Sequence, residues 1–305
     1  MKSVDGVLVT ISCVLVVVSS TPRAQSGSQT AATPYKKILL IGDRPSHGPA
    51  EHEHNAAVWL LQKALTKLPG IAATPSFGGW PADPQLIEQA DAIFMVCDGG
   101  ERHMAFQENR AEALQRAVAR GAGVMFLHYC VEPGAERGRQ EMLAWTGGYF
   151  EINYSVNPVW EADFKSLPDH PITRGVKPFT TRDEWYFNMR FRPNMQGVTP
   201  ILMAIPTPDT LSRPDGPHEG NPDVRAKAGQ PMVVAWATEA ANGSRGVGIT
   251  GGHYHINFGN ENFRKLVLNS VLWIAHIDVP PSGVDYALTP NELNERLDPK
   301  PARRR

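Results

Sequence analysis

Short apolar runs without alternation recur through the first half of the chain, and amphipathic segments separate them. The runs lie at residues 38–41, 71–74, 92–96 and 124–127. Parallel strands that are buried on both faces have this continuous hydrophobic pattern. Helical spacing of apolar residues, with suitable start and stop residues, predicts helices at 58–68, 83–90 and 108–120. The order predicts an α/β fold with a doubly wound, mostly parallel sheet and right-handed crossovers.

From residue 147 the pattern changes to strand-like segments rich in aromatic and β-branched residues, with no helical segment between them. These segments lie at residues 147–164, 179–187 and 198–206. They predict an antiparallel extension at the sheet edge. The following segment, residues 206–230, is so rich in proline, glycine and charge that we expect a surface loop without regular structure.

The last part of the predicted domain contains a hairpin and a long helix. The hairpin covers residues 231–250 and turns at Asn242 and Gly243, and the helix covers residues 261–276. We therefore expect one α/β domain over residues 36–278. The C-terminal tail, residues 279–305, is expected to be mostly solvated, and its arginine run at 303–305 is expected to be disordered.

The N-terminus has the pattern of a secretory signal peptide. Lys2 precedes an apolar run at residues 7–18, and Ala24 offers a small residue for cleavage. The run is shorter than the roughly 18 apolar residues that a membrane span needs. We expect a signal peptide at residues 1–24, a polar linker at 25–35, and a periplasmic or secreted protein with no membrane anchor after cleavage.

Charge and motif content limit the classes of partner. The chain has 30 Lys and Arg against 31 Asp and Glu, so no strong field favours nucleic acid or an anionic membrane. No glycine-rich dinucleotide or triphosphate motif occurs, so no nucleotide cofactor is expected. After cleavage only Cys97 and Cys130 remain, either as one disulfide or as two buried thiols. The oligomeric state stays open.

Four histidines follow the predicted strands and carry the functional argument. They are His52, His103, His128 and His253. Carboxyl ends of parallel strands line one crevice, so these side chains are expected to meet in one pocket and to bind a divalent metal, Zn²⁺ or a similar cation. Any one of them alone could instead cap a buried strand.

The neighbouring residues leave several alternatives open. His54 shares the pocket only if the backbone at residues 52–54 is extended, and His255 is either a metal ligand or a packing group. Glu184 is the strongest candidate for a catalytic carboxylate, although a solvated acid on a strand face fits the pattern equally well. His170, His218 and His276 are assigned to turns, loops and a helix end.

Aromatic residues near these segments could form a floor on which a sugar ring stacks, although most aromatics in such a chain belong to the core. The candidates are Trp80, Trp185, Tyr186, Tyr254 and Phe258.

The ordered motifs together resemble the trehalose-utilisation, or ThuA-like, family over residues 36–277. They are SHGPAEHEHN (46–55), GGERH (99–103), GVMFLHY (123–129), GGYF (147–150), DHPITRGV (169–176), DEWY (183–186), VAWA (234–237) and GGHYH (251–255). The resemblance implies a class I glutamine-amidotransferase-like, flavodoxin-like fold without glutaminase activity. It also implies a role in carbohydrate utilisation, on 3-keto sugars or keto-glycosides made by a partner sugar dehydrogenase. Matching motifs give the pocket residues as His52, His103, His128, Glu184 and His253.

These observations lead to one main hypothesis and two alternatives. The main hypothesis is an exported enzyme, an isomerase, lyase or hydrolase, that acts on a small-molecule carbohydrate. His128, Glu184, His253 and His103 are its expected catalytic residues, and His52, His103, His128 and His253 its metal ligands. The alternatives are a non-catalytic protein that binds a carbohydrate or a partner in the same pocket, and a cysteine hydrolase that uses Cys130 with His253.

Overall fold

A seven-stranded sheet forms the centre of the fold in the computed structural model, which describes residues 1, 6, 35–134 and 136–300. Its strand order is β2-β1-β3-β4-β11-β10-β9. The central strands are β1 (Lys36–Gly42), β2 (Ile71–Ser76), β3 (Ala92–Val96), β4 (Gly123–Leu127), β9 (Val198–Ala204), β10 (Met232–Glu239) and β11 (Arg245–Ile249). The strands from β2 to β11 in this order are parallel, whereas β10 is antiparallel to both its neighbours.

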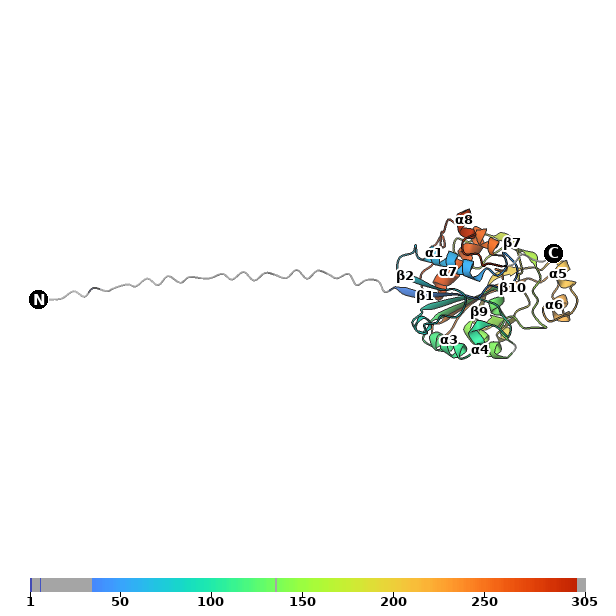
Figure 1. Cartoon of the computed structure of the whole chain (residues 1–305), viewed down its shortest axis with the longest axis horizontal. Coiled ribbons are helices and arrows are strands. Elements are labelled where there is room, and N and C mark those ends of the chain that lie inside the picture. The colour runs from blue at the N-terminus through green and yellow to red at the C-terminus, as the bar shows by residue number, and fades with distance from the viewer. Residues whose placement is uncertain (2–5, 7–34, 135, 301–305) are drawn as a thin grey trace. The chain divides into compact units, whose positions relative to one another are not determined.

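Helices cover both faces of the sheet, so β3, β4 and most of β1 are buried on both sides, as their unalternated pattern requires. Figure 1 shows α1 (His54–Leu65) and α7 (Glu261–Ile274) on one face, and α3 (Arg110–Ala119) and α4 (Arg137–Trp145) on the other. Two separate clusters of buried apolar side chains fill the two layers. The predicted doubly wound α/β fold is therefore confirmed.

The antiparallel part is more divided than the sequence pattern indicates. Only β9 extends the central sheet, while β6 (Trp160–Phe164) and β7 (Phe179–Asp183) form a hairpin of their own. A second small pair joins β5 (Gly148–Tyr149) to β8 (Arg190–Phe191). The short helical elements are α2 (Gln85–Glu88), α5 (Pro208–Leu211), α6 (Pro222–Ala226), α8 (Pro290–Leu293), η1 (Met104–Phe106), η2 (His128–Val131), η3 (Pro171–Thr173), η4 (Pro193–Met195) and η5 (His255–Gly259).

Two segments are more ordered than expected. The predicted loop at residues 206–230 contains α5 and α6, and Asn221 caps α6 by accepting a hydrogen bond from the Val224 amide at 3.0 Å. The predicted solvated tail packs against α1 and the loop before it as far as residue 300, and the carboxylate of Glu295 accepts a hydrogen bond from the Trp59 indole at 2.7 Å. Polar side chains that pair with the domain hold both segments, and hydrophobic periodicity does not detect such contacts.

The expected signal peptide, most of the linker and the arginine run at 303–305 lie outside the described residues. Within the part of the chain that the structure describes, no helix has the length and apolar character to cross a bilayer.

Candidate functional site

The candidate site lies at the carboxyl ends of the central strands, where three of the predicted histidines meet. His52 comes from the loop between β1 and α1, His128 follows β4 directly, and His253 lies in the loop after β11. In the sheet order, β1 and β3 form the point where the chain reverses direction across the sheet, and β4 and β11 are the next strands. The rule that ligands bind at the carboxyl ends beside such a point therefore fits these side chains.

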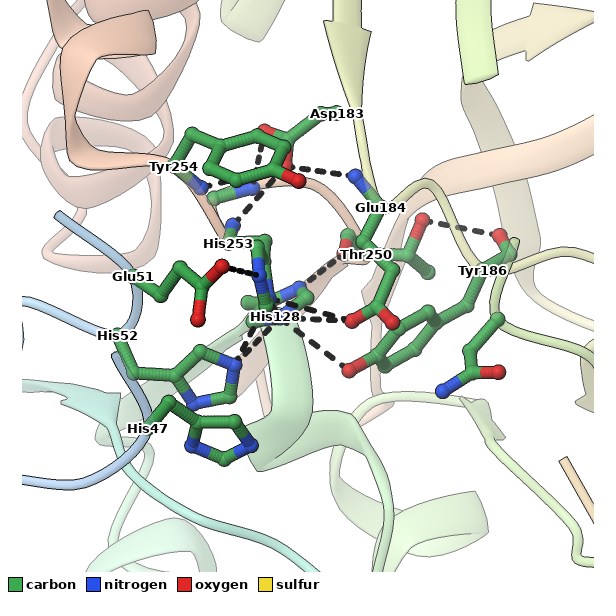
Figure 2. Close-up of polar contacts among 12 residues, drawn as sticks. His47, Glu51, His52, His128, Asp183, Glu184, Tyr186, Thr250, His253 and Tyr254 are labelled. Atoms are coloured by element: carbon green, nitrogen blue, oxygen red, sulfur yellow. Dashed lines mark hydrogen bonds and ion pairs between the residues drawn. The ribbon is translucent and has the colours of Figure 1, made fainter. Parts of the chain in front are cut away.

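The three imidazoles turn one nitrogen each toward a common centre (Figure 2). His52 Nε2 lies 3.0 Å from His253 Nδ1 and 3.1 Å from His128 Nε2, and the last two nitrogens are 3.3 Å apart. A carboxylate closes the group, because Glu184 Oε2 lies 3.3 Å from His253 Nδ1 and 3.5 Å from His128 Nε2. Glu184 follows the end of β7, so the cluster joins four segments that are far apart in the sequence.

The outer nitrogen of each imidazole faces an oxygen acceptor. His128 Nδ1 lies 2.7 Å from the Thr250 carbonyl oxygen, and His52 Nδ1 lies 3.2 Å from a carboxylate oxygen of Asp98. His253 Nε2 lies 3.6 Å from a carboxylate oxygen of Glu51. A proton held on each outer nitrogen leaves the inner nitrogen with a free lone pair, which is the arrangement of histidines that bind metals.

The cluster fits a tetrahedral metal ion. Bonds of about 2.0–2.1 Å from Zn²⁺ to imidazole place the ligand atoms of a tetrahedral site about 3.3 Å apart. The nitrogen separations of 3.0–3.3 Å among His52, His128 and His253 are close to that edge. Three protein ligands and one position left for water or substrate are typical of catalytic zinc sites.

Burial keeps two of these histidines neutral. It lowers the pKa of His52 to about 3 and holds the pKa of His128 well below its ordinary value. His253 differs, because burial lowers its pKa but the hydrogen bond and negative charge of Glu184 outweigh burial and raise it overall. Three imidazole nitrogens whose lone pairs point at one another repel unless at least one proton bridges them. A metal cation can take the place of that proton.

Two of the three histidines have a strained backbone. His52 has a φ of 46° and His128 a φ of 56°, a left-handed region that residues other than glycine rarely adopt. The turn at His128 aims its ring out of the sheet, as a sharp turn after a strand does for the nucleophile of α/β hydrolases. Such strain is concentrated at functional sites, where the surrounding structure holds it.

A buried carboxylate fixes the loop that carries His253. Asp183, at the end of β7, accepts backbone hydrogen bonds from Gly252 at 2.8 Å, His253 at 3.1 Å and Tyr254 at 3.4 Å (Figure 2). Burial raises the pKa of Asp183, although these hydrogen bonds and one from Asn257 act in the opposite direction. The same strand end thus places Glu184 in the cluster and orients the loop of His253.

The cluster opens into a cavity of about 410 Å³, a volume in the range of small-ligand sites. Most of its lining is polar, and it includes His47, His52, Tyr129, Asn157, Glu184, Tyr186, Arg213, His218, Glu219 and His253. A second cavity of about 780 Å³ shares His47 with the first and is lined by Trp80. Of the expected stacking residues, Trp185 and Phe258 are core residues instead, and Tyr186 is buried with its hydroxyl 3.2 Å from His128 Nε2.

The structure does not bring His103 into this cluster. Its Nε2 lies 2.8 Å from the Cys130 carbonyl oxygen, and its Nδ1 accepts a hydrogen bond from the Ala105 amide at 3.2 Å. The ring is fully buried, and burial lowers its pKa to about 4. His103 caps the short η1 helix, which is a structural role that its position seven residues after the end of β3 permits.

A disulfide joins Cys97, after β3, to Cys130, after β4. The bond leaves Cys130 without the free thiolate that a nucleophile requires. Cys130 is also completely buried. The geometry therefore gives no support to the alternative of a cysteine hydrolase.

Several site residues were not identified from the sequence. His47 stacks on His52 with ring centroids 3.6 Å apart, and Asp98 supports the outer nitrogen of His52. His218, which we assigned to a loop, lines the cavity and pairs with Glu132. The positions of Asp98 and Glu132 just beyond strands β3 and β4 were the signal that could have identified them. His54 is buried with Nδ1 3.1 Å from the Arg44 carbonyl oxygen, outside the cluster.

Comparison with known proteins agrees with the fold. A ThuA-like protein from Bacteroides uniformis has a TM-score of 0.56 at 15% sequence identity, covering 85% of this chain and 97% of that one. A ThuA-like protein from Parabacteroides merdae has a TM-score of 0.54 at 14% identity, covering 83% of this chain and 98% of that one. No curated protein matches.

The chain is thus an α/β protein with a glutamine-amidotransferase-like fold and a histidine cluster at the carboxyl ends of its central strands. The family model of ThuA, described as trehalose utilisation, matches residues 47–274, which is most of the chain. The chain therefore belongs to the ThuA family.

Proposed function

We propose that this protein is an exported, metal-dependent enzyme that acts on a sugar carrying a ketone, such as a 3-keto sugar or keto-glycoside. The convergence of three imidazole nitrogens, within 3.0–3.3 Å of one another, carries this proposal. A protein that only binds sugars needs no such cluster, because hydroxyl groups are recognised by ordinary hydrogen-bond donors and acceptors.

His52, His128 and His253 are the proposed ligands of the metal ion. Neutral imidazole nitrogens suit Zn²⁺ or a similar borderline cation. When bound, the ion would act as a Lewis acid that polarises the substrate carbonyl. Asp98, Thr250 and Glu51 hold the outer sides of the three rings, and loss of such partners typically weakens metal binding 10–100-fold.

Glu184 is the proposed general base. It lies beside the ligand nitrogens, and its side chain is 17% exposed at the cavity, so it can reach a substrate carbon. Removal of a proton from the carbon next to a ketone is the first step of isomerisation, epimerisation and elimination alike. Tyr186 stays protonated, because burial raises the pKa of its phenol well above the ordinary value, and it can donate a hydrogen bond to a substrate oxygen.

The substrate class rests on the family and on the cavity. The ThuA family is described as trehalose utilisation, and the cavity of about 410 Å³ has a polar lining suited to a sugar ring. A keto sugar has to be made by oxidation of a hydroxyl group, so we propose a sugar dehydrogenase as the functional partner.

The disulfide supports the export that we propose. Disulfides persist in oxidising compartments such as the periplasm and the extracellular space, and are rare in the cytosol. Sequencing the N-terminus of the protein secreted by its host tests this point. The expected mature N-terminus is Gln25, and an intact Met1 in the cytosolic fraction would contradict it.

Hydrogen exchange in D₂O tests the proposed chemistry without knowledge of the product. The probe is methyl 3-keto-β-D-glucopyranoside, and NMR follows the hydrogens on the carbons next to its ketone. The zinc-loaded protein is expected to accelerate their exchange, while Glu184→Gln removes this acceleration and keeps the metal. His128→Ala is expected to lose both, and elemental analysis measures the metal content of each protein.

The control variant is His276→Gln, which changes an exposed histidine at the end of α7. It should retain metal and exchange activity. Unchanged exchange in Glu184→Gln would show that this carboxylate is not the base, and a purified wild-type protein that takes up no divalent metal would refute the proposed cofactor.

A further inference from the structure

We propose that His218, held by Glu132, is the general acid that protonates the leaving oxygen when a keto-glycoside is cleaved by elimination. This inference rests on the proposed function and assigns its reaction type. It draws on a pair of residues outside the metal-ligand cluster.

The pair is built as a rigid unit. His218 Nε2 lies 3.0 and 3.1 Å from the two carboxylate oxygens of Glu132. The Glu132 side chain is 2% exposed, whereas the His218 side chain is 34% exposed. On one side the imidazole stacks on Phe150, with ring centroids 5.3 Å apart and an angle of 23° between the planes. Because Nε2 is engaged by the carboxylate, Nδ1 is the ring atom left to meet a ligand.

The exposed part of this unit faces the same cavity as the metal-ligand cluster. His218 lines the cavity of about 410 Å³ together with Glu184 and His253. Its backbone is held in place, because its carbonyl oxygen accepts hydrogen bonds from the Asn157 amide at 3.2 Å and from the Arg213 guanidinium at 3.4 Å. A ligand in this cavity therefore contacts a candidate base and a candidate acid at the same time.

The surrounding charges favour a protonated His218. The hydrogen bond that His218 donates to the Glu132 carboxylate raises the pKa of His218 and outweighs burial, and the negative charges of Glu184 and Glu219 act in the same direction. Arg213 is the cation nearby, and its charge is paired with Glu219 at 2.5 Å. Burial also raises the pKa of Glu132. A histidine that is charged near neutral pH can give up a proton during the reaction.

The proposed step is an elimination across the carbon next to the ketone and the glycosidic carbon. Glu184 takes the proton from the carbon between the ketone and the glycosidic carbon. The electron pair left on that carbon forms a double bond to the glycosidic carbon. The bond from the glycosidic carbon to the departing oxygen breaks, and its electron pair stays on that oxygen, which receives the proton from His218 Nδ1. The products are an alcohol and an unsaturated keto sugar, and proton transfer from Glu184 to His218 through water restores the starting state.

Two substrates with different leaving groups test the proposal. p-Nitrophenyl 3-keto-β-D-glucopyranoside releases a stable phenolate and needs little protonation, whereas the methyl glycoside releases an alkoxide that needs a proton. General acid catalysis contributes about 10²–10⁴-fold. We expect His218→Gln to slow cleavage of the methyl glycoside at least 100-fold and that of the p-nitrophenyl glycoside less than 10-fold.

Exchange of the substrate hydrogens in D₂O separates this inference from the proposed function. His218→Gln should exchange them at the wild-type rate and keep its metal, since Glu184 and the three ligand histidines are untouched. If His218→Gln slows hydrogen exchange and cleavage of the methyl glycoside to the same extent, or slows neither, the role of His218 is overturned. Absence of exchange in the wild-type protein would instead overturn the proposed function.

An NMR titration gives a readout that does not depend on turnover. The His218 ring is expected to titrate above the ordinary value of about 6.5 in the wild-type protein and at a lower pH in Glu132→Gln. A wild-type His218 that titrates below the ordinary value would also refute the inference, and His276→Gln serves as the matched control for folding.

Discussion

Replacing Lys300 with methionine removes one half of a buried ion pair that joins the C-terminal tail to the loop of His52, a proposed metal ligand. Lys300 Nζ lies 3.2 Å from Glu53 Oε1, and the two side chains are 2% and 1% exposed. The same ammonium group donates hydrogen bonds to the backbone carbonyls of Glu51 and His52. The substitution therefore leaves a carboxylate buried without its counter-ion and removes the ammonium donor from two carbonyls.

The expected loss of stability is large because of this burial. Breaking a buried pair by removing one partner costs about 3–5 kcal/mol, whereas exposed pairs contribute about 0–1 kcal/mol. Lys165 and Asp163 form a matched exposed pair, with a separation of 3.6 Å and side chains 83% and 53% exposed. Lys165→Met should therefore reduce the free energy of unfolding by less than about 1 kcal/mol.

Urea unfolding followed by circular dichroism measures the free energy of unfolding of both variants. The dependence of this free energy on urea concentration, the m-value, should be the same in both. The double variant Lys300→Met with Glu53→Gln should be less destabilised than the sum of its single variants, because no charge is then buried alone. The Lys300 variant should also bind zinc roughly 10–100-fold more weakly, since the His52 loop loses its anchor. A Lys300→Met variant as stable as Lys165→Met would refute the reasoning.

Three further predictions follow from buried groups around the site. Asp183→Asn should weaken zinc binding about 10–100-fold, because an amide cannot accept hydrogen bonds from the three loop amides as a carboxylate does; isothermal titration measures this, and unchanged affinity would contradict it. Burial lowers the pKa of His103 to about 4, so the unfolded chain binds this proton first and stability falls as pH falls from about 6.5 toward 4. His103→Gln should reduce the slope of the unfolding free energy against pH in this range by up to about 1.4 kcal/mol per pH unit. An unaltered slope would count against this prediction. Replacing Cys97 and Cys130 together by serine should reduce the free energy of unfolding by about 4 kcal/mol, as expected for a sequence separation of 33 residues; thermal unfolding tests this, and a cost below about 1 kcal/mol would contradict the chain-entropy account.

The first half of the fold could be predicted because its signals are local. Strands β1, β3 and β4 contain continuous buried apolar runs, and segments with helical spacing lie between them. The meeting of His52, His128 and His253 followed from a topological rule that needs only the strand ends. His103 shows the limit of that rule, because a residue several positions beyond a strand can turn back into the helical layer.

The missed contacts depend on pairing between remote polar groups. Lys300 and Glu53 are separated by most of the chain, and neither residue type indicates burial by itself. His218 lies in a segment whose composition indicates only a loop, and its proposed role depends on Glu132, which directly follows η2. Hydrophobic periodicity does not report which remote polar residues pair, so these contacts could be found only from the three-dimensional structure.

The contact of Lys300 with the His52 loop also sets an order of events during protein synthesis. Strands β1 to β4 and β11 can assemble while the C-terminal tail is still within the ribosome, because domains begin to fold as their N-terminal parts emerge. The loop that carries His52 gains its last anchor only after residue 300 has emerged. Assembly of the histidine cluster therefore follows completion of the sheet, and chains that stop short of the tail would yield a folded sheet whose His52 loop lacks its last anchor.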